Sequence, residues 1–534
     1  MAPLHASPLA RPPSARHPAL ATALASIGLL VAGPAAAVEP TTTGPSSSQS
    51  PYVVPVAPGV RTVSLLTVGD AVGPDDYRMV GIPDGLGAFN SSLRHFTLIM
   101  NHEISATNGI VRGHGSKGAF VSRWTIDRLT LRVVKGEDFT QTPQDVFLWD
   151  GATQTYVAGT TVWERHCSAD LPRLGAFYHN GKGTLERIYM NGEEVSQGRA
   201  WARVVTGQHA GEAWQLPRFG HLSYENAVAC PHPQDKTIVM LTDDGALSTA
   251  PVAASFPSEV YVYVGTKTRR GHPVEQAGLT NGALYGLKVS VKGQPVAEES
   301  NEFGLGDATS GFVGTGRFSL FNLGDVSSLD GLALEQASIT NGVTRFQRPE
   351  DGAWDPRPGR RDNFYFVTTA SLTTNCRLWH LHFDDIERPE RGGTIEILLK
   401  GDEGHGMLDN VTIDRWGRIL MDEDPGNTAR VSKIWLYQID TGAFIQVAAH
   451  NPKFFDPTPP TSPAFITQDE ESSGIIDASH ILGRGWFLLD VQAHKVSTDP
   501  ELVEGGQLLA MFVDPDIGRP GHDHDEDEGD DDEN

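Results

Sequence analysis

The chain has 534 residues, with 42 Lys+Arg against 67 Asp+Glu, and a formal net charge of −25. An acidic protein repels phosphate backbones, so this charge argues against a general nucleic-acid binder. The three cysteines exclude a disulfide-dense scaffold, and the content of aromatic and β-branched residues excludes a disordered chain.

The N-terminal residues are typical of a secretory signal peptide. Arg11 and Arg16 form a basic start, an apolar run follows from Ala19 to Ala32, and an A-x-A site ends at Ala37. An uncleaved membrane anchor is the alternative, but polar residues, glycine and proline dilute the apolar run below the length that spans a bilayer. We therefore expect a signal peptide over residues 1–37 and an extracytoplasmic mature protein, periplasmic or secreted, without membrane attachment.

Two further segments are expected to lie outside the folded domain. Residues 38–60 are rich in Thr, Ser and Pro, which is typical of a linker. Residues 516–534 end in a run with nine acidic residues and two histidines, which we interpret as a solvated acidic tail, with weak metal scavenging as the alternative. The folded domain is then predicted over residues 61–515.

Short apolar runs separated by turn-forming residues dominate this domain. Each run has four to seven residues and is bounded by Gly, Pro, Asn or Asp, which predicts β-strands. Long amphipathic helical patterns are scarce, so we expect an all-β fold. Examples of the predicted strands are Lys236–Thr242, Val260–Val264, Phe364–Thr368, Arg418–Met421 and Trp486–Val491.

A repeat becomes visible when these runs are aligned on the acidic residue that precedes them. The anchoring acids are Glu225, Glu350, Asp409 and Glu471, at intervals of 125, 59 and 62 residues. We interpret the first interval as two periods of about 60 residues. Radial repetition protects strand edges, so the pattern predicts a β-propeller, for which the length favours six blades with insertions.

Equivalent positions of propeller blades face the same central channel, so the four acids are expected to converge. Carboxylates that share a small volume have raised pKa values or bind a cation. The alternative is that each acid hydrogen-bonds its own turn. Four acids in register favour a metal site. The motifs G-x-S-x-G, H-E-x-x-H and C-x-x-C, which would indicate other chemistries, are absent from the sequence.

Several short motifs, in their order along the chain, resemble the PhoX-type alkaline phosphatase family. This family comprises exported β-propeller phosphomonoesterases with an iron–calcium centre. The resemblance runs from about Val60 to Asp514. The matching stretches are Asn101-His102-Glu103, Cys167, Glu193-Glu194, Gly220–Asn226, Arg348–Gly352 and Met407–Ile413.

The resemblance implies a role for individual residues. Cys167 would be a thiolate ligand of iron and Glu225 a second iron ligand, while Glu194 and Glu350 would bind calcium or bridge the metals. Arg348 would bind the phosphate, because a guanidinium matches two phosphate oxygens. A structural role is an equal alternative for His102. The expected catalytic residues are Arg348 and Asn101, and the expected metal ligands are Cys167, Glu194, Glu225, Glu350, Asp409 and Glu103.

The remaining cysteines bear on this assignment. Cys230 and Cys376 can pair as a disulfide, which would leave Cys167 free for a metal. The alternative is that all three are small core residues.

The leading hypothesis is an exported, metal-dependent phosphomonoesterase that uses calcium and iron on a phosphate-ester substrate. A calcium-dependent esterase or lactonase is one alternative, and a secreted calcium-binding propeller without catalysis is another. Nothing in the sequence indicates an obligate oligomer, so we expect a monomer.

Overall fold

The structure is a computed structural model that describes residues 40–245, 257–300, 304–305, 314–372 and 374–519. The predicted signal peptide and the acidic residues from 520 onward lie outside this part of the chain. Within the described ranges, no helix is long and apolar enough to cross a membrane. Residues 516–519, which we assigned to the tail, form a turn in which Ile517 packs against the core.

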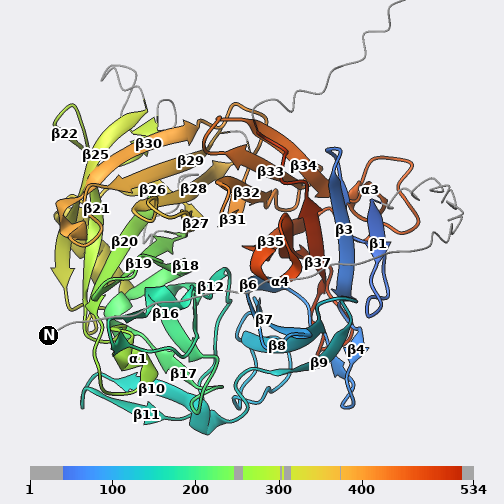
Figure 1. Ribbon diagram of the computed structural model, residues 1–534, viewed down its shortest axis with the longest axis horizontal. Helices are drawn as coiled ribbons and strands as arrows, with labels where there is room; N and C mark the ends of the chain where they lie inside the picture. Colours follow the sequence, from blue (N-terminus) through green and yellow to red (C-terminus); the bar gives the residue numbers. More distant parts are fainter. Residues whose placement is uncertain (1–39, 246–256, 301–303, 306–313, 373, 520–534) are drawn as a thin grey trace, which may run out of the picture. The chain divides into compact units, whose positions relative to one another are not determined.

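The described residues form a six-bladed β-propeller, as predicted (Figure 1). Blade 1 contains β6 (Pro83–Asn90), β7 (His95–His102), β8 (Phe120–Asp127) and β9 (Val133–Asp138). Blade 2 contains β12 (Ala169–Asp170), β15 (Ile188–Gly192), β16 (Glu194–Val204) and β17 (Ala213–Gln215), with β10 (Val146–Asp150) and β11 (Thr155–Ala158) beside them. Blade 3 contains β18 (His221–Ala229), β19 (Lys236–Asp243), β20 (Pro257–Thr266) and β21 (Ala283–Val291).

The other three blades repeat this antiparallel arrangement. Blade 4 contains β27 (Pro349–Trp354), β28 (Asn363–Ser371), β29 (Thr374–Phe383) and β30 (Gly393–Leu399). Blade 5 contains β31 (Leu408–Ile413), β32 (Arg418–Glu423), β33 (Lys433–Gln438) and β34 (Phe444–His450). Blade 6 contains β35 (Glu470–Asp477), β36 (Trp486–Ala493), β37 (Gly505–Val513) and the early strand β3 (Val60–Thr67).

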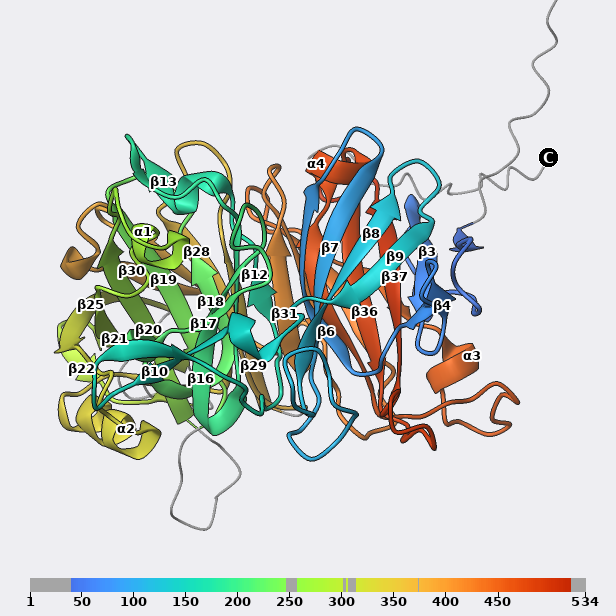
Figure 2. The same ribbon diagram turned by 90° about the horizontal axis from the view of Figure 1, so that it is seen from below.

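The first strand of each blade lies next to the axis. These innermost strands contact one another in the order β6, β12, β18, β27, β31, β35 and back to β6, so the ring is closed. Figure 2 shows the strands running between the two faces of the propeller. Helices are few and short among the described residues: α1 (Pro273–Gln276), α2 (Gly331–Thr340), α3 (Pro452–Phe455) and α4 (Ser479–Leu482).

The hydrophobic core is divided among the interfaces between neighbouring blades. On β19, Ile238 and Met240 pack in the cluster shared with blade 4, whereas Val239 and Leu241 pack in the cluster shared with blade 2. Successive side chains of a strand point to opposite faces, so a strand between two blades must be apolar on both. This explains why the predicted strands read as continuous apolar runs.

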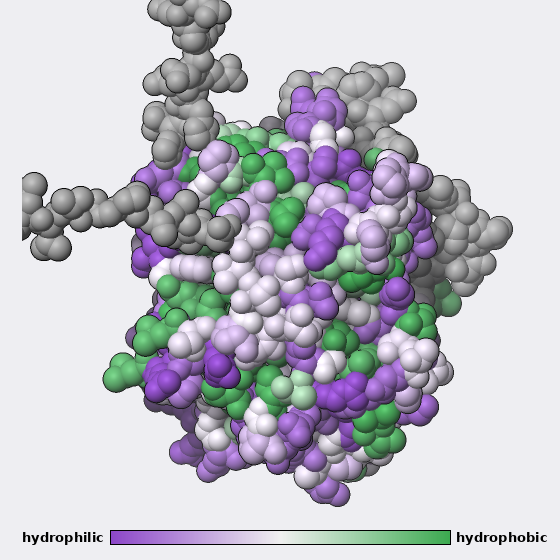
Figure 3. All heavy atoms as spheres, turned by 90° about the vertical axis from the view of Figure 1, so that its right-hand side faces the viewer, coloured by the Kyte–Doolittle hydropathy of each residue, from purple (hydrophilic) through white to green (hydrophobic). Residues whose placement is uncertain are grey.

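The predicted linker over residues 38–60 is wrong from Pro40 onward. Its strand β1 (Thr41–Thr43) pairs with β3, and β2 (Val53–Pro55) pairs with β34 at the edge of blade 5. The amide of Tyr52 also donates a 2.6 Å hydrogen bond to buried Gln507. β2 contains Pro55, and proline is tolerated in edge strands such as this one. Figure 3 shows hydrophilic and hydrophobic side chains interspersed on the side of the molecule that carries β1 and α3.

The interpretation of the 125-residue interval as two periods is also wrong. Glu225 lies on β18 of blade 3 and Glu350 on β27 of blade 4, and these two strands are neighbours in the ring. The extra length is an insertion in one blade. It contains β22 (Gln294–Val296), β25 (Thr315–Gly324), α2 and β26 (Arg345–Gln347).

Candidate metal centre on the propeller axis

A polar cavity of about 280 Å³ lies among the innermost strands. Its walls combine nine carboxylates with one thiol, two guanidinium groups and one imidazole. The residues are Asp84, Glu103, Arg165, Cys167, Glu194, Glu225, Asp244, Arg348, Glu350, Asp409, Asp424, Glu471 and His494.

Six of the lining residues occupy one equivalent position in the six blades, and we call them the inner ring. The inner ring comprises Asp84, Cys167, Glu225, Glu350, Asp409 and Glu471; Cys167 lies two residues before β12, and the other five lie on innermost strands. On β6, β18, β27 and β31 this residue sits at a β-bulge. Bulges re-aim a side chain and often occur next to functional sites. The structure thus brings together the four acids that the repeat predicted.

A second set of residues, the outer ring, is fixed to the first by a recurring hydrogen bond. The backbone amide of each outer-ring residue donates to the carbonyl two residues before the inner-ring residue. In blade 1, for example, Glu103 N donates to Ile82 O at 2.8 Å, two residues before Asp84. The other five bonds run from Glu194 to Arg165, Asp244 to Ser223, Thr369 to Arg348, Asp424 to Met407 and His494 to Asp469, at 2.8 to 3.0 Å.

Three of the six accepting residues have left-handed backbones: Ile82 at φ 51°, Arg348 at φ 53° and Met407 at φ 52°. Side chains with a Cβ rarely adopt this region, and each such residue costs about 1–3 kcal/mol. The strain recurs at one position of blades 1, 4 and 5, always two residues before an inner-ring carboxylate. We conclude that the surrounding fold enforces this turn and thereby sets the direction of the carboxylate that follows.

Two arginines at the cavity mouth neutralise part of its charge. Arg348 donates to Asp244 at 2.8 and 2.9 Å and lies 3.0 Å from Glu350 Oε1. Arg165 pairs with Glu103 at 3.0 Å and with Glu194. The side chain of Arg165 is 41% exposed and that of Arg348 is 28% exposed, against 2% for Glu350. The positive groups therefore face solvent above a buried negative floor.

The buried acids are difficult to ionise together. Burial, with repulsion from neighbouring carboxylates, raises the pKa values of Asp84, Glu350 and Asp409 well above the usual range. The same causes raise the pKa of Asp424 to about 7. Glu471 differs: burial is the largest single influence and would raise its pKa, but His494, Ser473 and Arg165 together outweigh burial and lower it.

The donor groups fit metal ions. In three sets, the ligand atoms all lie within 4.8 Å of one another: Asp84/Glu103/Cys167, Glu225/Glu350/Asp409 and Asp409/Asp424/Glu471. The two all-carboxylate sets offer the hard oxygen ligands that calcium prefers. The set with a thiol suits a softer transition metal.

Contacts on two sides hold Cys167 at the cavity. Its Sγ donates to Glu194 Oε2 at 2.7 Å, and burial raises its thiol pKa well above the usual value. Behind it, Asn101 donates to the Cys167 carbonyl at 2.6 Å and accepts hydrogen bonds from Tyr189 and Asn191. Asn101 is fully buried and does not line the cavity, so the expectation that it is catalytic is wrong. It positions the backbone that carries Cys167.

A hydrogen-bonded layer forms the floor of the cavity. Ser168 donates to Glu225 at 2.5 Å and also binds Asn410, whose side-chain oxygen accepts from Gly474 N at 3.2 Å. Asn226 donates to Asp351 at 2.6 Å. These groups come from blades 2 to 6 and tie the innermost strands together across the axis.

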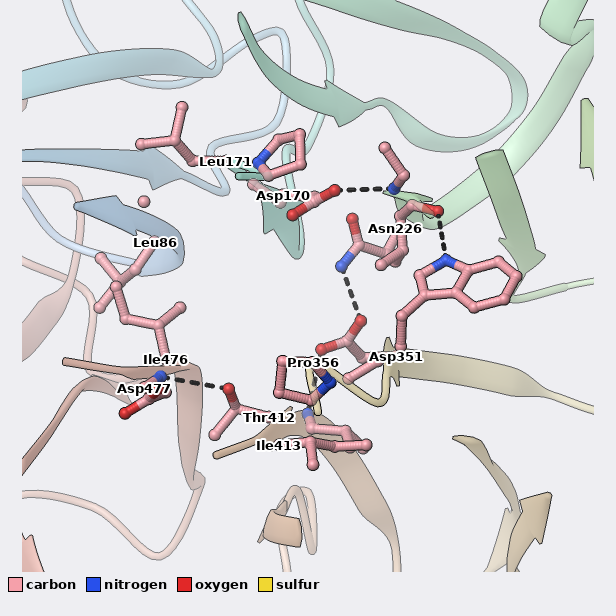
Figure 4. Close-up of a pocket in the computed structure, with 18 of the residues that line it drawn as sticks. Leu86, Asp170, Leu171, Asn226, Asp351, Pro356, Thr412, Ile413, Ile476 and Asp477 are labelled. Carbon is pink, nitrogen blue, oxygen red and sulfur yellow. Dashed lines mark hydrogen bonds between the residues drawn. The ribbon is translucent and has the colours of Figure 1, made fainter. Parts of the chain in front are cut away.

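Below this floor the innermost strands line a second cavity, shown in Figure 4. It has a mixed wall in which Leu86, Ile413 and Ile476 lie opposite Asp170 and Asn226. Burial raises the pKa of Asp170 to about 7. The axial channel is thus divided into a charged compartment and a more apolar one.

Two open questions from the sequence are settled by side-chain contacts. His102 is fully buried, stacks on Phe120 and contacts Ser122 at 2.9 Å, so it is a structural histidine. The disulfide between Cys230 and Cys376 is not formed, because all three cysteines are free and buried. Cys230 packs in the core between blades 3 and 4, and Cys376 in the core between blades 4 and 5.

Sequence reasoning named seven of the thirteen lining residues as catalytic or metal-binding and expected an eighth, Glu471, to converge with three of them. It assigned no role to Asp84, Arg165, Asp244, Asp424 or His494. Asp84 has a detectable signal, since Pro83-Asp84 resembles Pro349-Glu350, where a proline also precedes the inner-ring acid. The outer-ring residues Asp244 and Asp424 have no such signal, because only the antiparallel pairing of two strands brings them to the cavity.

Comparison with known proteins identifies similarity in fold but not in sequence. No known family profile and no curated protein matches the sequence. Among solved structures, the chain is similar to Pseudomonas fluorescens PhoX in complex with vanadate, a transition state analogue, with a TM-score of 0.59 and 11% identity over 86% of this chain and 97% of that chain. The α-L-arabinofuranosidase PaAbf62A from Podospora anserina, in complex with cellotriose, has 9% identity over 84% and 95% and a TM-score of 0.32, too low to support an argument. The chain therefore has a PhoX-like fold.

Proposed function

We propose that this protein is an exported, metal-dependent phosphomonoesterase whose centre lies in the axial cavity. The observation that carries the proposal is the inner ring, in which five carboxylates and one thiol from six blades converge beneath two guanidinium groups. A site built only for structural calcium does not need arginines at its mouth. The similarity in fold to a phosphatase crystallised with vanadate supports the same chemistry.

The donor sets divide the metals between two parts of the cavity. Cys167, Asp84 and Glu103 form the set with a soft ligand and would hold iron. Glu225, Glu350 and Asp409, with Asp424 and Glu471 beyond them, would hold calcium. This differs from the expectation that Cys167 and Glu225 bind one iron, because they belong to different sets. Bound metal ions would neutralise the carboxylates and act as Lewis acids toward a phosphoryl group.

The chain's own positive groups would orient the substrate. Arg348 and Arg165 now pair with carboxylates that belong to the metal-binding sets or border them. When cations neutralise those carboxylates, both guanidinium groups become free to bind phosphate oxygens. His494 adds positive charge at the mouth. Burial opposes its protonation, but contacts with Glu471 and Glu504 outweigh burial and raise its pKa to about 11.

The test is hydrolysis of p-nitrophenyl phosphate by the purified mature chain, first treated with chelator and then supplied with Ca²⁺ and Fe³⁺. We expect activity only after metal addition, and we expect Glu225→Gln to lose both metal and activity. Glu259→Gln is a matched control, since Glu259 is an equally buried acid on β20 outside the cavity. Full metal loading without turnover would exclude the phosphatase and favour a calcium-binding propeller. Activity that survives exhaustive chelation would place the chemistry elsewhere.

A further inference from the structure

A second group of side chains that could bind a metal lies in the connections between outer strands of blades 2 and 3. His209 and Glu212 lie in the turn between β16 and β17 of blade 2. His272 is the N-cap of α1, in the connection from β20 to β21 of blade 3. One ligand atom from each of the three residues lies within 4.8 Å of the other two.

Glu212 is the centre of this group. Its Oε1 lies 2.8 Å from His209 Nδ1, and its Oε2 lies 2.7 Å from His272 Nε2. The indole of Trp214 donates to Oε2 at 2.8 Å and stacks on the His272 ring, with centroids 4.1 Å apart. The carboxylate and both imidazoles are therefore held in place by neighbours and converge on one point.

A further carboxylate adds negative charge beside the group. Glu186 interacts electrostatically with His209 and Glu212, and one of its oxygens is buried without a hydrogen-bond partner among the described residues. Burial lowers the pKa of His272, which favours the neutral imidazole that metals bind. Two imidazoles and two carboxylates, partly shielded from water, form an environment that suits a divalent cation.

We propose that His209, Glu212 and His272 bind a zinc ion that links blade 2 to the α1 connection of blade 3. Two nitrogen ligands disfavour calcium, whereas zinc commonly takes two histidines and one glutamate in tetrahedral sites. The side chain of Glu212 is 17% exposed and that of His272 is 11% exposed, which leaves access for a water molecule or Glu186 as fourth ligand. Coordination at His272 Nε2 moves the ring proton to Nδ1. It thereby breaks the long 3.3 Å hydrogen bond that Val274 N donates to Nδ1.

The site is tested on the full mature chain after its axial cavity has been saturated with calcium. Zinc stoichiometry and affinity are then measured by equilibrium dialysis for the wild type, His209→Ala and His272→Ala. The matched control is His179→Ala. His179 also contacts a carboxylate, Asp235, at 3.0 Å, and its side chain is exposed to a similar degree as that of His209. Amide hydrogen exchange with and without zinc reports on residues 205–212 and 268–277.

The wild type and His179→Ala are expected to bind one more zinc ion per chain than either site variant. Loss of one ligand should weaken this zinc affinity at least about 100-fold. Zinc should slow exchange in both segments of the wild type and in neither segment of the site variants. Equal zinc binding by the wild type and both site variants would overturn the proposal. Because His209 caps no helix, its variant remains decisive if His272→Ala disturbs α1.

Discussion

Arg165 and Arg348 occupy the same structural position in blades 2 and 4. Each lies two residues before an inner-ring residue, Cys167 or Glu350, and the backbone carbonyl of each accepts the amide of the following strand at 2.9 and 3.0 Å. Each guanidinium pairs with two acidic side chains. The fold has thus placed two equivalent cations among the residues that line the acidic cavity.

The first prediction concerns the shape of the Arg348 side chain. Arg348→Lys keeps the charge but loses the planar fork that binds two oxygens at once. We expect kcat/KM for p-nitrophenyl phosphate to fall about 100-fold, as for loss of one preorganised donor. The control is Arg357→Lys, since Arg357 pairs with Asp355 and Asp440 outside the cavity. An unchanged kcat/KM in Arg348→Lys would remove Arg348 from the reaction.

The second prediction concerns the thiol. Cys167→Ser replaces the single soft ligand of the cavity by a hard, weakly coordinating hydroxyl. We expect iron content, measured by elemental analysis, to fall at least about tenfold while calcium content remains. Visible absorption from thiolate-to-iron charge transfer should disappear as well. Cys376→Ser is the control, because Cys376 is equally buried but lies in the core between blades 4 and 5.

The sequence predicted those parts of the fold that repeat locally. Glu225, Glu350 and Asp409 each precede an apolar run, so the repeat identified their strands and their common direction. Blade 2 escaped this pattern because its innermost strand, β12, has only two residues and its inner-ring residue is Cys167, which is not an acid. The insertion after β21 has about the length of one repeat. Spacing alone cannot distinguish an added blade from a lengthened one, so the insertion was counted as a missing period.

Two outer-ring residues, Asp244 and Asp424, could not be predicted from the sequence, for a different reason. Asp424 and Asp244 follow their strands at ordinary turn positions, where an acid usually binds its own backbone. Only the antiparallel pairing of two strands brings each beside the inner ring. Asn101 shows the converse case, in which a motif residue lies near the site and supports it from behind.

The third prediction follows from that position. Asn101→Ala leaves the Cys167 carbonyl and the Asn191 side-chain amide without this buried partner. We expect the free energy of unfolding to fall by about 1–3 kcal/mol, measured by urea denaturation. Asn281→Ala is the control. Asn281 also makes two hydrogen bonds, both to Thr266, but it is exposed, so its loss should be smaller. Equal losses in the two variants would contradict a supporting role for Asn101.

The fourth prediction links pH, stability and metal. The pKa of Asp424 rises from 3.8 to about 7 in the folded protein. An acid whose pKa is raised by folding binds more protons in the folded than in the unfolded state. Its contribution to the free energy of unfolding is therefore complete below the unfolded pKa and is lost as the pH rises through the folded pKa. In chelator, we expect the free energy of unfolding to fall between about pH 4 and pH 7, by on the order of 4 kcal/mol from this group. Urea denaturation at pH 4 and pH 8 measures the change.

Calcium should reverse this loss, because it binds the ionised carboxylates of the native state only. A variant of Asp170 distinguishes the effect of pH on stability from the effect of calcium. The pKa of Asp170 is also raised to about 7, yet it lines the lower compartment beneath the hydrogen-bonded floor. Asp170→Asn should therefore reduce the pH dependence and leave the stabilisation by calcium at pH 8 intact, whereas Asp424→Asn should reduce both. If calcium stabilises the two variants equally, the cation is bound outside the axial cavity, and the raised pKa values there reflect burial alone.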